Sequence, residues 1–369
     1  MNELNRKPGS APFYIMNGVS LIYRISFFKE KVVKMFVFKK RKQKIGWLLC
    51  FSSFLLFWSI FISGCHSERS FSNDKEASAK NQFFYTVTDD TGLSLQFSEK
   101  PKRIVSYSIS TDEILLALVE PQRIIALSRL VDDPGVSSIV KEAKQVPNRV
   151  KGNSLEGVLA FKPDLVIIPD FHPPEMLQSA RELGLKVYIY KTPSDIKGVK
   201  RSIRQLAALT GEKEKGEALV AQMEEKISRV QKRLEAIPQV QRKRVMQLRS
   251  EGAFYAPDNS FGDVCRHAGV TDATLELHYP NAMEITQEKI VELNPDIIFV
   301  PAWDYDGEHE PVAERQKIMN NPSYKGIKAV KQGNVYGISG ALVLTVSQYI
   351  ADAVEEVAKM SYPDAFGKK

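Results

Sequence analysis

The chain has 369 residues, of which 43% are hydrophobic and 26% are charged, a composition typical of a globular protein. A chain of this length is too long to fold around one small hydrophobic core, so two domains are predicted. The net charge of +7 originates in residues 1–64, which contain 11 Lys/Arg and 2 Asp/Glu. The other residues carry 40 basic and 42 acidic side chains, so the charge gives no support for nucleic-acid binding.

The beginning of the chain has the pattern of a targeting sequence. The basic run Lys39–Lys44 precedes twenty residues without a charge, Ile45–Gly64, and then Cys65. The last four of these residues, "ISGC", resemble the lipobox of bacterial lipoproteins, which implies cleavage before Cys65 and lipidation of this cysteine. A retained transmembrane helix is the alternative, because twenty apolar residues can span a bilayer. We expect residues 35–64 to be a lipoprotein signal peptide and the exported protein to be anchored by lipid to the outer face of the cell membrane.

Two further segments flank this signal. Translation is expected to start at Met35, because a signal peptide begins well there, whereas Arg24 interrupts the apolar stretch before it. Residues 1–34 are then a start-site extension. Residues 65–82 are polar, rich in Ser and Lys and without periodicity, and they predict a flexible tether.

The cysteine content is consistent with an exported protein that has no internal disulfide. Of the three cysteines, Cys50 lies in the apolar run and Cys65 is the predicted lipid site. Only Cys265 remains, so no disulfide can form within the mature chain. We expect Cys265 to be a buried, inert thiol on a helix rather than a nucleophile.

The rest of the chain alternates between strands and helices in two rounds. A hairpin is expected around Thr91 and Gly92, just after order begins near Phe83. Continuously apolar strands separated by helices then predict parallel sheets that are covered on both faces. We therefore predict an α/β fold with two three-layer lobes, an N-terminal lobe over residues 83–211 and a C-terminal lobe over residues 238–369.

A single long helix over residues 212–237 is predicted between the lobes. Its apolar side chains recur at steps of three and four residues, which places them in one stripe. A helix of about 25 residues is about 37 Å long, enough to run across two lobes. The alternative, a coiled-coil segment, would need a longer repeat. The stripe consists of Val220, Met223, Ile227, Val230 and Leu234.

One local unit occurs twice. "SLEGVLAFKPDLVIIPD" begins at Ser154 and "TQEKIVELNPDIIFVPA" begins at Thr286, and both predict a helix, a Pro-Asp turn and a buried strand. Ser154 and Thr286 are suitable N-caps, which would place Glu156 and Glu288 in the first turns. A carboxylate is favoured there by the helix dipole, so both glutamates could simply stabilise the helix starts.

Five segments in order carry a resemblance to a known family. They are "PKRIVSYSISTDEILLAL", "SLEGVLAFKPDLVII", "NSFGDVCRHAGV", "TQEKIVELNPDIIFV" and "NPSYKGIKAVKQGNVYGIS". This order resembles the substrate-binding lipoproteins of iron-siderophore and vitamin B12 ABC importers, from about Phe83 to the C-terminus. The resemblance implies a class III periplasmic-binding-protein-like fold, in which one long backbone helix joins two α/β lobes and the ligand lies in a shallow cleft between them.

The resemblance also implies a function and a partner. The protein would capture a ferric siderophore and deliver it to an ABC permease dimer with its ATPase, as a monomer and without a cofactor or chemistry of its own. A corrinoid or haem is the alternative ligand. In the family, one glutamate on this helix of each lobe pairs with arginines of the permease, which implies docking roles for Glu156 and Glu288.

Candidate cleft residues follow the ends of predicted strands, where open parallel sheets bind ligands. Aromatic side chains with a few arginines suit a large, partly apolar, anionic ligand. Arg249 and Trp303 are favoured because each closes a C-lobe strand. The full set is Tyr107, Ser108, Ser128, Arg129, Phe171, His172, Arg249, Phe254, Tyr255, Trp303 and Tyr305.

Other classes of function receive less support. Direct metal-ion binding needs converging histidines and carboxylates, and the five histidines show no ligand spacing. No metal site or catalytic residue is predicted, because nucleophile-elbow, phosphate-loop and H-E-x-x-H motifs are all missing from the sequence. Oxyanion binding and a purely adhesive lipoprotein are the remaining alternatives, and the latter would need no matched glutamates.

Overall fold

The computed structural model describes residues 85–150, 152, 155–302 and 311–367. The described residues all belong to one compact unit, which is bounded by Phe83 and Lys369. The predicted signal peptide, Cys65, Ser154, Trp303 and Tyr305 lie outside the described residues. No helix in the described part of the chain is long and apolar enough to cross a membrane.

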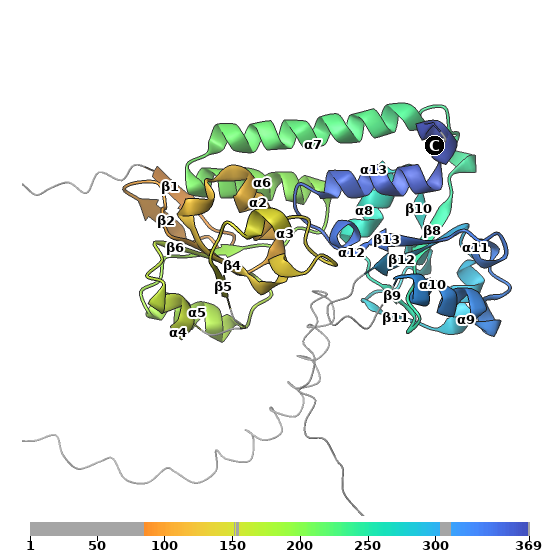
Figure 1. Cartoon of the computed structure of the whole chain (residues 1–369), viewed down its shortest axis with the longest axis horizontal. Helices are drawn as coiled ribbons and strands as arrows, with labels where there is room; N and C mark the ends of the chain where they lie inside the picture. The colour runs from red at the N-terminus through yellow and green to blue at the C-terminus, as the bar shows by residue number, and fades with distance from the viewer. Residues whose placement is uncertain (1–84, 151, 153–154, 303–310, 368–369) are drawn as a thin grey trace, which may run out of the picture. The chain divides into compact units, whose positions relative to one another are not determined.

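The N-terminal lobe is built on a five-stranded parallel sheet in the order β5-β4-β3-β6-β7 (Figure 1). The predicted hairpin is present as β1 (Tyr85–Thr88) and β2 (Ser94–Phe97), which pair antiparallel. Helices α2 and α6 cover one face of the sheet, and α4 and α5 cover the other, which gives the predicted three layers. The strands are β3 (Ile104–Ser106), β4 (Ile124–Ser128), β5 (Asn148–Val150), β6 (Leu165–Pro169) and β7 (Val187–Tyr190); the helices are α2 (Ile109–Leu118), α3 (Val140–Ala143), α4 (Glu156–Ala160), α5 (Pro174–Glu182) and α6 (Ile196–Thr210).

The C-terminal lobe repeats this design on a four-stranded parallel sheet in the order β10-β8-β12-β13. Helices α8 and α13 cover one face, and α9, α10 and α11 cover the other. A short antiparallel pair, β9 (Ala253–Tyr255) with β11 (Met283–Ile285), is added to it and was not predicted. The remaining elements are β8 (Arg244–Gln247), β10 (Thr271–Asp272), β12 (Ile297–Ala302), β13 (Val335–Ser339), α8 (Ser260–His267), α9 (Gln287–Leu293), α10 (Pro311–Asn320), α11 (Lys328–Lys331), α12 (Gly340–Val343) and α13 (Ile350–Ser361).

Alternating strand residues divide the apolar interior into separate cores. In β6, Leu165 and Ile167 join the core under α2 and α6, whereas Val166 and Ile168 join the core under α4 and α5. Successive side chains of a strand point to opposite faces, so a continuously apolar strand buries both. The same alternation in β12 separates the two cores of the C-terminal lobe.

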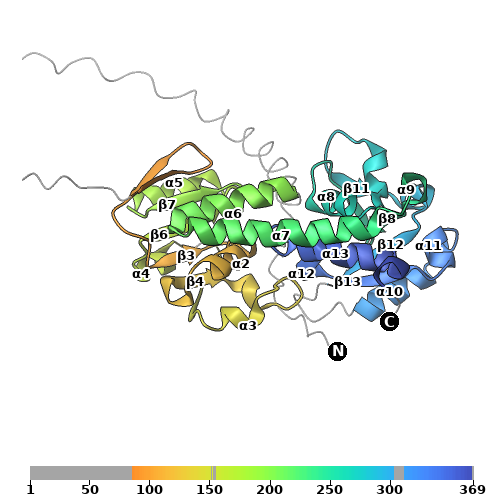
Figure 2. The ribbon, with the colours of Figure 1, turned by 90° about the horizontal axis from the view of Figure 1, so that it is seen from above.

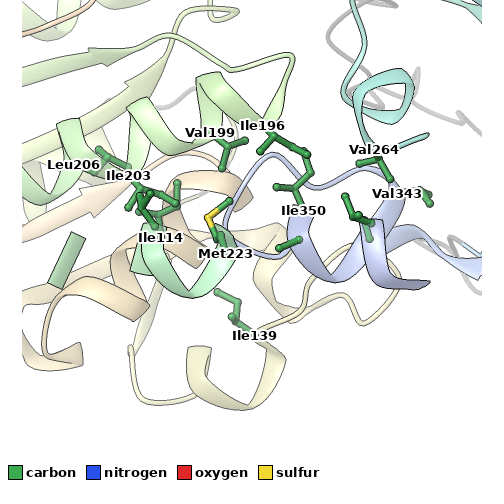
Figure 3. Close-up of a cluster of buried hydrophobic side chains, with 14 of the residues drawn as sticks. Ile114, Ile139, Ile196, Val199, Ile203, Leu206, Met223, Val264, Val343 and Ile350 are labelled. Atoms are coloured by element: carbon green, nitrogen blue, oxygen red, sulfur yellow. The ribbon is translucent and has the colours of Figure 1, made fainter. Parts of the chain in front are cut away.

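One of these cores extends through both lobes along the long helix α7 (Lys213–Leu234). All five residues of the predicted stripe on α7 are buried. Figure 2 shows α7 running from the N-terminal lobe, beside α6, to the C-terminal lobe, beside α13. Figure 3 shows how Met223 of α7, Ile196 of α6 and Ile350 of α13 belong to this interior. We call this set of buried residues the shared core.

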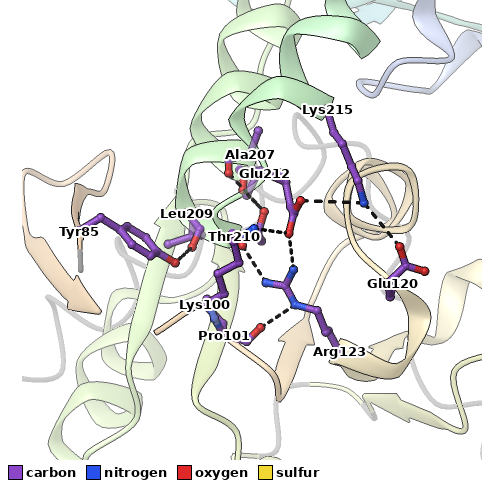
Figure 4. A network of polar contacts seen from close by, with 11 residues as sticks. Tyr85, Lys100, Pro101, Glu120, Arg123, Ala207, Leu209, Thr210, Glu212 and Lys215 are labelled. Atoms are coloured by element: carbon purple, nitrogen blue, oxygen red, sulfur yellow. Dashed lines mark hydrogen bonds and ion pairs between the residues drawn. The ribbon is translucent and has the colours of Figure 1, made fainter. Parts of the chain in front are cut away.

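A polar network fixes the point where α6 ends and α7 begins (Figure 4). Gly211 ends α6 in the left-handed conformation, with φ of 75°. Glu212 then accepts hydrogen bonds from Arg123 Nη1 at 2.6 Å and Lys100 Nζ at 3.1 Å. Burial alone would raise the pKa of Glu212, but these two cations hold it below its usual value. The start of the long helix is therefore tied to the sheet of the N-terminal lobe.

The duplicated unit has the same local structure in both lobes. Lys162 comes after α4 and Asn294 comes after α9. Both have left-handed backbone conformations, with φ of 46° and 43°. Asp164 and Asp296, two residues further on, each accept the backbone N–H at the start of a neighbouring strand, at 3.0 Å beside β3 and 2.8 Å in β8. The two helices and the strands that follow them are thus structural counterparts, as the sequence repeat predicted.

Close packing of α6 against α7 gives a first testable prediction. A Cβ added at Gly216 would overlap the Cβ of Ala207 on α6. Although alanine favours helices by about 1 kcal/mol over glycine, we expect Gly216→Ala to lower the free energy of unfolding by about 1–3 kcal/mol through overpacking. Gly157→Ala on α4 is the matched control, because its Cβ would meet nothing within 4 Å, and it should be neutral or stabilising. Urea denaturation measures both, and equal midpoints would contradict the close contact.

Candidate functional site

Three predicted cleft residues of the N-terminal lobe contact one another beyond the sheet's carboxyl edge. Tyr107 follows β3, and Phe171 and His172 follow β6. The ring of His172 lies edge-on to Tyr107, with centroids 5.6 Å apart, and is stacked on Phe171 at 5.0 Å. Burial, and to a lesser extent the charge of Glu156, raises the pKa of Tyr107 to about 12, so its hydroxyl stays protonated. Burial lowers the pKa of His172, which favours the neutral ring at physiological pH.

Ser108 and Ser128 lie deeper, in a polar network at the start of α2. Ser108 is the N-cap of α2 and accepts the N–H of Thr111 at 3.4 Å. Ser128, at the end of β4, donates its N–H and its hydroxyl to Asp112 at 3.0 and 2.5 Å. Burial raises the pKa of Asp112 to about 7. Both serines are buried, whereas Arg129, the next residue, is exposed.

The candidate residues of the C-terminal lobe occupy the turn after β8 and the strand β9. Arg249 forms an ion pair with Glu251 at 3.2 Å. Phe254 is 43% exposed, whereas Tyr255 is buried and packs edge-on against Tyr279 at 5.4 Å. Of these three side chains, Phe254 is the most accessible to a ligand.

Two open hollows in the described part of the chain lie elsewhere on the C-terminal lobe. One, of about 410 Å³, is lined by residues of α10 and the segment after it, and by Ser250 beside Arg249. The other, of about 270 Å³, lies between α9 and the segment around Tyr279. Neither is lined by a predicted cleft residue. Within the described ranges, no three His, Cys, Asp or Glu side chains form a cluster that could hold a metal ion.

The two matched glutamates are exposed on equivalent helices. Glu156 lies in the first turn of α4 and Glu288 in the first turn of α9. Thr286 is the N-cap of α9, as predicted, and accepts the N–H of Lys289 at 3.4 Å. Helix α4 instead begins after Leu155 without a side-chain cap, and the cap predicted at Ser154 lies outside the described residues. Hydrogen bonds from its own backbone N–H and from Thr286 lower the pKa of Glu288, which keeps it ionised.

Sequence reasoning missed the two most unusual acidic residues of this region. Asp112 and Glu113 are adjacent on α2, and each is almost fully buried. They lie in the segment "STDEILLAL". The helical periodicity of this segment would have predicted that one of the two acids lies near the buried face of the helix. Cys265, by contrast, is a buried free thiol as predicted, and burial raises its pKa well above the usual value.

Comparisons with known proteins identify the class to which this architecture belongs. Residues 104–342 match the family model described as periplasmic binding protein, and the chain belongs to this family. Members are solute-binding proteins rather than enzymes, and so is this chain.

Individual relatives cover most of the chain. An ABC transporter substrate-binding lipoprotein of Bacillus subtilis, YvrC, is 26% identical over 85% of this chain and 96% of the relative. A second Bacillus subtilis protein, named "Probable siderophore-binding lipoprotein YfiY", is 23% identical over 80% of this chain and 93% of the relative. The crystal structure of a periplasmic binding protein from Veillonella parvula shares the fold, with a TM-score of 0.62, 22% identity and coverage of 75% of this chain and 96% of that one.

Proposed function

We propose that the protein is an exported lipoprotein that captures a ferric siderophore and delivers it to an ABC permease. The observation that carries this proposal is the pair of equivalent, exposed glutamates, one on each lobe of a periplasmic binding protein. A permease built from two similar subunits would present two equivalent basic sites to such a pair. Lipidation at Cys65 would keep the protein beside its permease on the outer face of the membrane.

An iron chelate as the ligand is supported by the aromatic group in the N-terminal lobe and by the siderophore-binding name of one relative. Phe171 and His172 are partly exposed and offer ring surface, with the buried Tyr107 packed against His172. Arg129 adds an exposed cation at the same edge. A large, partly apolar and anionic chelate needs this combination of surfaces. Corrinoid and haem share the apolar part of this requirement, and the experiment below separates them.

The ligand class can be identified by the fluorescence of a single tryptophan. Trp47 and Trp58 lie in the predicted signal peptide, so a soluble chain beginning at His66 retains only Trp303. We expect a ferric hydroxamate or a ferric catecholate to quench this indole saturably after correction for the inner-filter effect. Cyanocobalamin and haemin are the competing ligands, and saturation by either alone would reassign the substrate. No response to any of the four, confirmed by calorimetry, would contradict the proposed ligand classes.

A further inference from the structure

One buried carboxyl group joins the two lobes. Glu113 lies on α2 of the N-terminal lobe and is 1% exposed. Its Oε2 accepts hydrogen bonds from Thr345 Oγ1 at 3.2 Å and Ser347 Oγ at 2.5 Å, both in the segment between α12 and α13. Gln348 of the same segment donates to the main-chain carbonyl of Glu113 at 2.8 Å. Within the N-terminal lobe, Glu113 Oε1 accepts the N–H of Ser138 at 3.0 Å.

The surroundings of Glu113 provide hydrogen-bond donors but no compensating charge. Among the described residues, no lysine or arginine forms an ion pair with it. Burial raises the pKa of Glu113 to about 7, against the lowering effect of hydrogen bonds from Ser347, Ser138 and Thr345. Among the described residues, two titratable groups interact electrostatically with Glu113, namely Asp112 on α2 and Tyr349 at the start of α13. The pKa of Tyr349 is raised by burial first and then by the charges of Glu113, of Glu142 on α3 and of Asp352 on α13.

A second carboxylate also crosses between the lobes, but its charge is compensated. Asp263 of α8 accepts the N–H of Ile196, the first residue of α6, at 2.7 Å. It also forms an ion pair with Arg266 on its own helix at 3.0 Å. His267 lies 3.6 Å from the same carboxylate, but burial lowers its pKa and favours the neutral ring. Glu113 therefore differs from Asp263, because its ionised form is held only by neutral donors.

We propose that Glu113 is a proton-controlled contact between the lobes, in which the neutral acid holds α2 against the α12–α13 segment and the carboxylate favours their separation. Separation admits water to Glu113, and a hydrated carboxyl ionises more readily than a buried one. The state that ionises more readily gains population as the pH rises, so the contact weakens as the pH rises through neutrality. The pH outside the cell would then shift the balance between lobes held together and lobes free to move.

Hydrogen exchange of the α12–α13 segment tests this proposal directly. Residues 83–369 form a compact unit with their own cores, so this part of the chain is suitable. We expect the protection of the Thr345–Tyr349 amides, corrected for intrinsic exchange, to fall at least about tenfold between about pH 5.5 and 8.5. A fall of this size corresponds to a difference of about one unit between the pKa of Glu113 when the lobes are in contact and when they are separated. The Glu113→Gln variant should show no such fall. Strand β6 supplies the internal reference, and a parallel fall there would indicate global destabilisation and overturn the proposal.

The neighbouring acid supplies the matched control. Asp112 is equally buried and its pKa is also raised to about 7, but Ser128, which donates two hydrogen bonds to it, lies in its own lobe. Asp112→Asn should therefore retain the pH dependence of the α12–α13 segment. Loss of the dependence in this variant, or its persistence in Glu113→Gln, would show that Glu113 does not control the contact.

Ser347→Ala keeps the proposal testable if the Glu113→Gln variant does not fold. This change removes a hydrogen bond that favours the carboxylate, so the neutral acid should persist to higher pH. We expect the midpoint of the pH-dependent exchange to move upward. An unchanged midpoint would exclude Glu113 as the titrating group.

Discussion

Alanine at both Glu156 and Glu288 is expected to abolish cellular uptake of the iron chelate while leaving the affinity of the purified protein for it unchanged. The two side chains are exposed on counterpart helices, α4 and α9. Glu156 lies close enough to the cleft residue Tyr107 for its charge to raise the pKa of that residue, so ligand affinity must be measured alongside uptake. Exposed charge pairs are individually worth about 1 kcal/mol or less. The pair must therefore act by orienting both lobes on the permease, and each single variant should retain part of the uptake.

This prediction has a charge-matched control on the same two lobes. Glu175, in the first turn of α5, and Glu292, in the last turn of α9, are also exposed. Alanine at both of these positions removes the same charge and should leave uptake intact. Uptake assays in cells, with binding measured separately on purified protein, distinguish docking from ligand capture. Weaker ligand binding in the Glu156 and Glu288 double variant would place these residues in the cleft instead.

Phe299→Ala is expected to lower the free energy of unfolding by about 3–5 kcal/mol, the usual cost of emptying a buried phenylalanine site. Phe299 lies in β12, is fully buried in the shared core and packs edge-on against Phe261 of α8, with ring centroids 6.4 Å apart. Neighbouring strands and helices hold the site from several sides, so the cavity cannot collapse easily.

Chemical denaturation of the variant measures this loss. Phe254→Ala provides the control, because Phe254 is 43% exposed and its removal should cost less than about 1 kcal/mol. A loss below about 1 kcal/mol for Phe299→Ala as well would mean that this part of the shared core repacks around the missing ring.

The parallel sheets and α7 could be predicted because their sequence patterns are long and regular. Strands such as β6 and β7 are apolar at every position, and the α7 stripe repeats over five residues. Helix α6 was not predicted, although Asp195 caps it and Gly211 ends it. The signal was present, because Ile196, Val199, Ile203 and Leu206 recur at steps of three and four residues and are all buried.

The candidate site was less predictable because strand ends specify position and not side-chain partners. The strand-end rule brought Tyr107 and His172 to one edge of a sheet, where they touch. It gave no indication that Ser128 would be used by Asp112, or that Arg249 would pair with Glu251 two residues away. Burial of Asp112 and Glu113 depends on α2 packing against distant segments, such as Ser347 in the other lobe, and no local pattern contains that information.

The shared core means that the lobes are not interchangeable parts. A cut before β8 would leave the buried stripe of α7 exposed on one fragment and the apolar side of α13 exposed on the other. A chimera that takes its C-terminal lobe from a relative would need to bring α7, α8 and α13 together, because their side chains interlock. Divergence of ligand preference in such a protein is therefore easiest at the strand ends, which lie away from this joint interior.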